Sequence, residues 1–209
     1  MSSDQDRPEL ITGPMPSSMA PPAGTKALLF DCDGTLVDTM ALYKNSWKVV
    51  FAARGFELTE EWFESMRGHS LDPFIRAAFP GIDESELRQI EAEGLQLFFS
   101  RIHELETFEH VVEVAREYRG KIPLAVVSGG PRSAVEATLN GSGLTELFDV
   151  ILTGSDVVHG KPAPDVYLKA MEILGVQPHE CVVYEDSPTG IAAARSAGIN
   201  HVVDITLHG

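Results

Sequence analysis

Two aspartates, Asp31 and Asp33, lie one residue apart in the stretch LLFDCDGTLVDT, which covers residues 28–39. They follow a hydrophobic run that is typical of a buried strand, so two negative charges would lie close together at the end of this strand, beside the hydrophobic core. Paired carboxylates at this spacing can divide one reaction between them. One can attack phosphorus as a nucleophile, while its neighbour donates a proton to the leaving oxygen and later takes one from water.

Polar residues also follow three later hydrophobic runs. Ser128 ends the second run and is followed by Gly129, Lys161 lies in the loop after the third, and Glu185 and Asp186 end the fourth. If these runs form a parallel sheet, their carboxyl ends face the same crevice. The scattered side chains would then meet the aspartate pair at one site.

Four carboxylates within a few ångströms would repel one another, which raises their pKa values, unless a cation lies among them. The set contains neither Cys nor His, and hard oxygen ligands suit Mg²⁺ better than zinc or copper. The candidate metal ligands are Asp31, Asp33, Glu185 and Asp186. A phosphoryl group beside the ion could bind to Lys161, the Ser128 hydroxyl and the backbone amides of Gly34 and Gly129.

Each of these signals also has an ordinary structural explanation. Taken alone, Asp-x-Asp-Gly-Thr is typical of a solvated turn, Lys161 of a surface lysine and Ser128 of a helix cap. Glu185 and Asp186 alone could be acidic residues that a helix dipole favours. Their joint placement at four strand ends indicates a catalytic site, because chance does not readily produce it.

The elements that must position these residues are short aliphatic runs alternating with helical stretches. Continuous apolar runs indicate strands buried on both faces, as in a parallel sheet covered by helices. We therefore expect an α/β fold with a doubly wound, parallel, five-stranded Rossmann-like sheet. The expected strands cover residues 26–31, 122–128, 148–154, 181–186 and 201–205.

One connection in this pattern is much longer than the others. Residues 40–106 have helical spacing of apolar residues and no strand, which predicts an all-helical cap inserted after the first strand. The α/β core would then consist of residues 25–39 and 107–209. Residues 1–24 are rich in Pro, Ser and Gly without a hydrophobic period, so we expect a disordered tail.

Composition limits the classes of partner. The chain has 209 residues, a formal net charge of −15 and a pI near 4.8, which disfavours nucleic acid and anionic membranes as partners. No apolar run has the length of a membrane span and no signal peptide pattern is present, so we expect a cytoplasmic protein, and a monomer. Cys32 and Cys181 show no metal-binding spacing and are expected to be buried, reduced thiols.

Four motifs in order, DCDGT, VVSGG, GKPAPD and YEDS, resemble those of the haloacid dehalogenase superfamily. The resemblance covers about residues 26–206 and lies within the branch of sugar-phosphate phosphatases and β-phosphoglucomutase-like proteins, which carry a helical C1 cap. It implies that Asp31 is the phosphoryl-accepting nucleophile. Asp33 would be the general acid/base and would bind the metal through its main-chain carbonyl. Members that dehalogenate lack this second aspartate, so Asp33 disfavours dehalogenation.

The resemblance also assigns the other motif residues. It implies that Ser128 and Lys161 bind phosphate and stabilise charge, and that Glu185 and Asp186 hold Mg²⁺. In the cap, a turn containing Arg67 and His69 lies where the family has a substrate-specificity loop. We expect these two side chains to bind substrate, and Lys44 and Arg76 to lie on solvated helix faces instead.

Two cap positions depart from the phosphoglucomutase pattern. Mutases of this family carry a cap histidine where this chain has Tyr43, and an arginine that binds a second phosphate where it has Leu71. We therefore predict a Mg²⁺-dependent phosphatase that acts on a small-molecule phosphate ester, a sugar or polyol phosphate, through an aspartyl-phosphate intermediate. The alternatives are a β-phosphoglucomutase-like phosphosugar mutase and a non-catalytic phosphate-binding module. The non-catalytic module would require the loss of Asp31 or Asp33, and both are present.

Overall fold

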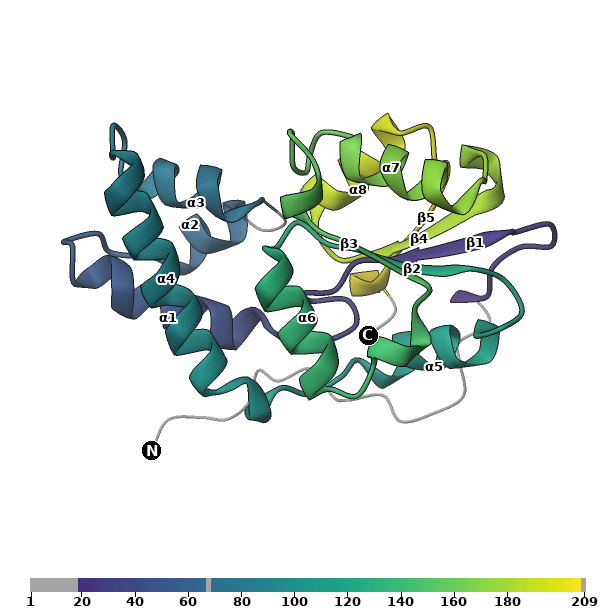
Figure 1. Cartoon of the computed structure of the whole chain (residues 1–209), viewed down its shortest axis with the longest axis horizontal. Coiled ribbons are helices and arrows are strands. Elements are labelled where there is room, and N and C mark those ends of the chain that lie inside the picture. Colours follow the sequence, from purple (N-terminus) through teal and green to yellow (C-terminus); the bar gives the residue numbers. More distant parts are fainter. Residues whose placement is uncertain (1–18, 67–68, 208–209) are drawn as a thin grey trace.

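The computed structural model describes residues 19–66 and 69–207 and contains one parallel, five-stranded sheet (Figure 1). The strand order is β3-β2-β1-β4-β5, so the first strand of the chain lies at the centre. Every expected run contains one strand, which confirms the predicted sheet. The strands are β1 (Ala27–Phe30), β2 (Leu124–Val127), β3 (Val150–Leu152), β4 (Cys181–Glu185) and β5 (His201–Asp204).

Helices cover both faces of the sheet, as predicted for a doubly wound fold. Side chains of a strand alternate between faces, so Leu28 and Phe30 pack in one core cluster while Ala27 and Leu29 pack in another. In Figure 1, α5 and α6 lie below the sheet and α7 and α8 above it. These helices are α5 (Glu109–Tyr118), α6 (Arg132–Gly141), α7 (Asp165–Leu174) and α8 (Pro188–Ser196).

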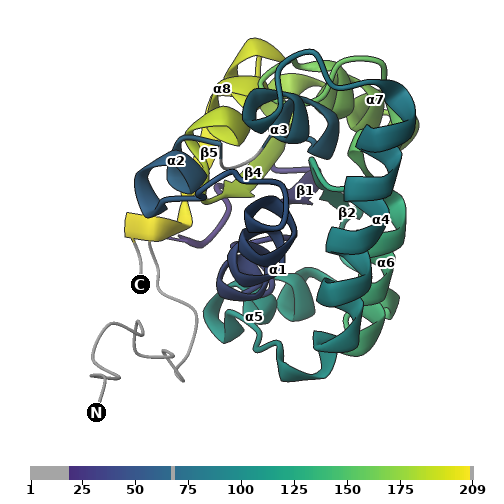
Figure 2. The ribbon, with the colours of Figure 1, turned by 90° about the vertical axis from the view of Figure 1, so that its left-hand side faces the viewer.

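The long connection after β1 forms a group of helices beside the core, on the left in Figure 1 and in front in Figure 2. It has its own hydrophobic cluster, in which the rings of Trp47 and Phe74 lie 5.6 Å apart. The helix that crosses this cluster must approach closely, since a Cβ added to Gly94 would lie 2.1 Å from the Trp47 ring. The elements are α1 (Met40–Ala52), α2 (Glu60–Ser65), α3 (Leu71–Ala78), α4 (Glu84–Ser100) and η2 (Ile102–Glu104).

The chain enters and leaves this helical group along two hydrogen-bonded segments. The amide of Asp38 donates to the carbonyl of Glu106 at 2.8 Å, and the amide of Phe108 donates to the carbonyl of Leu36 at 3.0 Å. Two adjacent connections of this kind are what an insertion into the α/β core requires. The remaining short 3₁₀ turns are η3 (Thr145–Leu147), η4 (Gly154–Asp156), η5 (Pro178–Glu180) and η6 (Ile205–Leu207).

The expectation of a disordered tail over residues 1–24 is wrong for its last part. Met19 is fully buried in the core, and the Tyr184 hydroxyl donates a hydrogen bond to its carbonyl at 2.8 Å. A single hydrophobic anchor in a Pro-rich segment produces no periodic pattern, so the sequence did not reveal it. Residues 1–18 lie outside the described part of the chain.

The two cysteines are buried free thiols, as predicted. Burial raises the pKa of Cys181 to about 11, so this thiol stays protonated at neutral pH. None of the helices within residues 19–66 and 69–207 combines the length and apolar character needed to cross a bilayer.

The connection from β3 to α7, which carries Lys161, begins at an anchored carboxylate. Asp156 Oδ2 accepts hydrogen bonds from the Thr153 amide at 2.8 Å and from Arg132 at 2.6 Å. Desolvation raises the pKa of Asp156, but these hydrogen bonds outweigh it, so its pKa lies below the ordinary value. The carboxylate form therefore stabilises this connection.

We expect Asp156→Asn to lower the free energy of unfolding by about 1–2 kcal/mol at pH 7. Because the folded-state pKa is depressed, this contribution is fully present above the unfolded-state pKa of about 4 and is lost as pH falls through the folded-state value. Urea unfolding at several values between pH 7 and pH 3 would measure it, with Asp38→Asn, at an exposed carboxylate, as the control. A destabilisation that does not change with pH would contradict the stabilising role of the ionised Asp156 carboxylate.

Candidate active site

The predicted polar residues meet at the carboxyl ends of the central strands. Asp31 directly follows β1, and its amide donates to the Tyr184 carbonyl at 3.0 Å, so the ladder with β4 positions the carboxylate. Ser128 follows β2, and the carboxyl end of β4 supplies Glu185 and Asp186. Parallel register brings these ends together, as expected.

Lys161 and Asp31 form a buried ion pair at this edge. The lysine Nζ lies 2.7 Å from Asp31 Oδ1 and 3.3 Å from Glu185 Oε1, and its side chain has no exposed surface. Burial opposes the charge on Lys161, but Asp31 and Glu185 outweigh it and hold the lysine pKa well above its usual value. Lys161 therefore stays protonated at neutral pH beside Asp31.

Three carboxylates form a cluster that fits a hard divalent cation. One oxygen each from Asp31, Glu185 and Asp186 lies within 4.8 Å of the others, and all three residues are buried. The lysine offsets only part of this charge, because burial and then Glu185 still raise the pKa of Asp31 well above its usual value. Carboxylate oxygens with excess negative charge suit a hard divalent cation such as Mg²⁺.

Local structure holds this cluster in shape. The Glu185 carboxylate accepts hydrogen bonds from the Ser187 hydroxyl at 2.7 Å and from the Asp186 amide at 3.0 Å. Asp186 Oδ1 accepts one from Thr35 at 2.9 Å. A Cβ on Gly190, in the first turn of α8, would lie 1.5 Å from Glu185 Oε1, so only glycine leaves room for this carboxylate.

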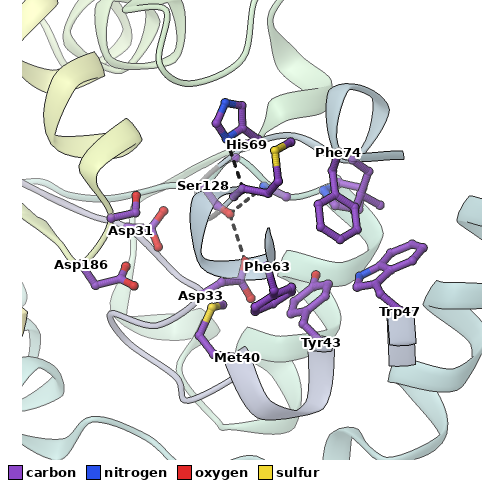
Figure 3. A pocket seen from close by; sticks show the side chains of 16 residues that line it. Asp31, Asp33, Met40, Tyr43, Trp47, Phe63, His69, Phe74, Ser128 and Asp186 are labelled. Carbon is purple, nitrogen blue, oxygen red and sulfur yellow. Dashed lines mark hydrogen bonds between the residues drawn. The ribbon is translucent and has the colours of Figure 1, made fainter. Parts of the chain in front are cut away.

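Asp33 faces the cluster from the turn after β1. The Ser128 hydroxyl donates to its Oδ2 at 3.3 Å and itself accepts from the Gly130 amide at 3.0 Å (Figure 3). Within the described chain, Asp33 Oδ1 is buried without a hydrogen-bond partner. Desolvation raises the pKa of this carboxyl, which favours a group that can carry a proton.

A pocket opens between this edge and the helical insertion. Figure 3 shows Asp31 and Asp186 on one side of it and Tyr43, Trp47 and Phe74 on the other. From the core it is lined by Asp31, Asp33, Ser128, Gly129, Gly130, Pro131, Asp186 and Ser187. From the insertion it is lined by Met40, Tyr43, Trp47, Phe63, Met66, His69, Leu71 and Phe74.

The structure does not bring every predicted phosphate ligand to this pocket. The Gly34 amide donates to the Val37 carbonyl at 2.9 Å, so it is already satisfied and is not available to a phosphate as predicted. Gly34 has a φ of 90°, which the tight turn requires, and this is its observed role. Gly129 does line the pocket, whereas Lys161 lies behind Asp31.

The residues of the insertion that the sequence analysis singled out lie in different places. His69 lines the pocket, and its Nδ1 lies 3.1 Å from the Met66 carbonyl. Arg67 lies outside the described residues. Lys44 pairs with Glu60 at 2.7 Å. Arg76 pairs with Asp72 on its own helix and with Glu84 at the start of α4, as expected for solvated faces.

Two functional features escaped the sequence analysis. The aromatic wall of the pocket, including Phe63 and Phe74, had only the helical period that any packed helix shows. Tyr167 was also missed, although it closely follows the GKPAPD motif. Its ring centroid lies 5.2 Å from Lys161 Nζ, within the range of a cation–π contact that holds the lysine in place.

The sequence also matches a known protein family. A family model described as haloacid dehalogenase-like hydrolase matches residues 28–203. This chain belongs to that family. The predicted membership is therefore confirmed, and with it the prediction of an enzyme, a haloacid dehalogenase-like hydrolase.

Named relatives lie close in sequence and structure. The chain is 32% identical over 186 residues to the fructose-1-phosphate phosphatase YqaB of Escherichia coli (strain K12), covering 86% of this chain and 96% of the relative. Its fold matches CbbY from Rhodobacter sphaeroides in complex with phosphate, with a TM-score of 0.73, 28% identity and 85% of each chain covered. A putative β-phosphoglucomutase from Thermotoga maritima matches with a TM-score of 0.64, 31% identity and coverage of 85% of this chain and 84% of that chain.

Proposed function

We propose that this chain is a Mg²⁺-dependent phosphatase that hydrolyses a small sugar or polyol phosphate through an aspartyl-phosphate intermediate on Asp31. One observation carries the proposal. The Asp31 carboxylate borders the pocket while it is paired with buried Lys161 and clustered with Glu185 and Asp186. The name of the fructose-1-phosphate phosphatase relative supports the substrate class.

In the first half of the reaction, Asp31 attacks phosphorus. A new bond forms between a carboxylate oxygen of Asp31 and phosphorus, and the bond from phosphorus to the leaving oxygen breaks. Asp33 donates its proton to that oxygen, so the product leaves as a neutral alcohol. The raised pKa of Asp33 suits this role, because the carboxyl can carry a proton closer to neutral pH.

In the second half, water attacks the phosphorus of the aspartyl phosphate. Asp33, now a carboxylate, takes a proton from this water, and the bond between phosphorus and Asp31 breaks to release phosphate. Ser128 and the Gly129 turn lie beside Asp33 at the core side of the pocket, where they would bind the phosphoryl oxygens. Lys161 keeps one Asp31 oxygen oriented throughout.

The proposed metal ligands are the carboxylates of Asp31, Glu185 and Asp186, together with the main-chain carbonyl of Asp33. When bound, Mg²⁺ would supply positive charge that lets these acids and the phosphoryl group lie together. The insertion over residues 40–106 acts as the cap, and His69 and Arg67 remain proposed substrate-binding residues. Cap closure would exclude water that is not positioned for attack.

Phosphate release from a panel of sugar and polyol phosphates, with and without Mg²⁺, tests this function. We expect release that depends on Mg²⁺ for at least one ester of the panel. The mutase alternative, which the putative β-phosphoglucomutase relative keeps open, predicts instead that phosphate stays in the product and that turnover needs a bisphosphate primer. Leu71 lines the pocket, and its apolar side chain lacks the charge that would bind a second phosphate, which favours hydrolysis. The absence of release from every ester would overturn the proposal.

A further inference from the structure

Tyr43, on the inner face of α1, has a buried hydroxyl that points into the pocket (Figure 3). Only 8% of the residue is exposed, and the hydroxyl has no hydrogen-bond partner within residues 19–66 and 69–207. Its ring is fixed by stacking on Phe98, with centroids 4.4 Å apart. The hydroxyl is therefore held at a defined place on the cap side of the pocket.

A buried hydroxyl without a partner is unfavourable, because no hydrogen bond replaces the one that it makes with water in the unfolded chain. Burial and the nearby negative charge of Asp33 raise the pKa of Tyr43 well above its usual value, so the group is a neutral donor at any working pH. A substrate atom is the natural partner, because the free hydroxyl adjoins the space that a bound ester would fill.

The surroundings of Tyr43 decide which part of the ester it meets. The polar residues that suit the phosphoryl group, such as Ser128, come from the core side, whereas Tyr43 comes from the cap. On the cap side, its neighbours in the pocket wall include Met40, Trp47 and Phe63, which offer apolar surface. A leaving group that fills the pocket would therefore lie against this wall, with its C–H face on the aromatic rings.

We propose that the Tyr43 hydroxyl donates a hydrogen bond to a hydroxyl oxygen of the leaving group, and so selects phosphate esters of uncharged polyhydroxylated alcohols. This inference rests on the proposed phosphatase function and adds the atom that recognises the alcohol. Tyr43 is a specificity-determining residue, and an ester of the same length without hydroxyl groups gains nothing from it.

Tyr43→Phe tests the inference, because it removes the hydroxyl and keeps the ring on Phe98. The paired substrates are sorbitol 6-phosphate and hexyl phosphate, which have six carbons each and differ in their hydroxyl groups. We expect kcat/KM for sorbitol 6-phosphate to fall about tenfold, the value of one hydrogen bond, while kcat/KM for hexyl phosphate stays within about twofold. Tyr118→Phe, on α5 outside the pocket, is the matched control and should change neither value.

Calorimetric binding of the same two esters in an Asp31→Asn background gives a second readout that needs no turnover. If wild type releases no phosphate but Tyr43→Phe weakens binding of sorbitol 6-phosphate alone, the proposed function fails and the Tyr43 inference stands. An equal loss for both esters, or no loss for either, overturns the inference whether or not the protein is a phosphatase. Absence of both turnover and binding for the pair overturns it as well.

Discussion

Asp31→Asn is expected to lower the rate of phosphate release by about 10⁴-fold or more, because an amide oxygen cannot replace the carboxylate as nucleophile. The carboxylate is buried at the pocket edge, and Lys161 and the acidic cluster are arranged around it. Initial rates on the best ester of the panel, at saturating Mg²⁺, would measure the loss.

Two further variants make this result specific. Asp33→Asn should lower the rate by about 10²–10⁴-fold, the range typical of a general acid/base. Asp38→Asn removes an exposed carboxylate just after the turn that holds Asp33, and should leave the rate unchanged. If Asp31→Asn retained more than a tenth of the wild-type rate, Asp31 would not be the nucleophile, and another group would have to attack phosphorus.

Mg²⁺ is expected to stabilise the fold itself, by about 2.7 kcal/mol when its concentration is 100 times the Kd. Without a cation, burial and the neighbouring carboxylates disfavour the charge on Asp31. An ion bound only by the folded state would relieve this repulsion, so Tm should rise with Mg²⁺ and fall after chelation. Differential scanning calorimetry across a Mg²⁺ titration would measure the shift, and phosphate release after chelation should be lost in parallel.

Variants of the cluster should remove the Mg²⁺-dependent Tm shift. Asp186→Asn deletes a proposed ligand, and Gly190→Ala displaces the Glu185 carboxylate without changing any charge. Glu172→Gln, at an exposed position on α7, should keep the full shift and serves as the control. A Tm that rises equally with Mg²⁺ in wild type and in Asp186→Asn would exclude the cluster as the metal site.

The sequence alone determined the sheet and the core of the site. Aliphatic runs that are continuous, as in residues 181–186, are a local signal of strands buried on both faces. Parallel strands share one carboxyl edge, so naming the residues at strand ends also predicted that Asp31, Ser128 and Asp186 would meet. Lys161 was found in the same way, from its place after the third run.

Contacts between segments that are distant in the sequence were determined only by the tertiary structure. Met19 is buried in a core cluster built from distant segments, where Tyr184 also bonds its carbonyl. The Gly34 amide is occupied because the turn folds back to Val37. The helical period identified the inner face of α1 but not what that face meets, so the sequence marked Tyr43 only as a departure from the mutase pattern and not as a substrate-binding group. Periodicity indicates which side of a helix or strand is buried. Function depends on which residues that side contacts, and only the folded chain determines these contacts.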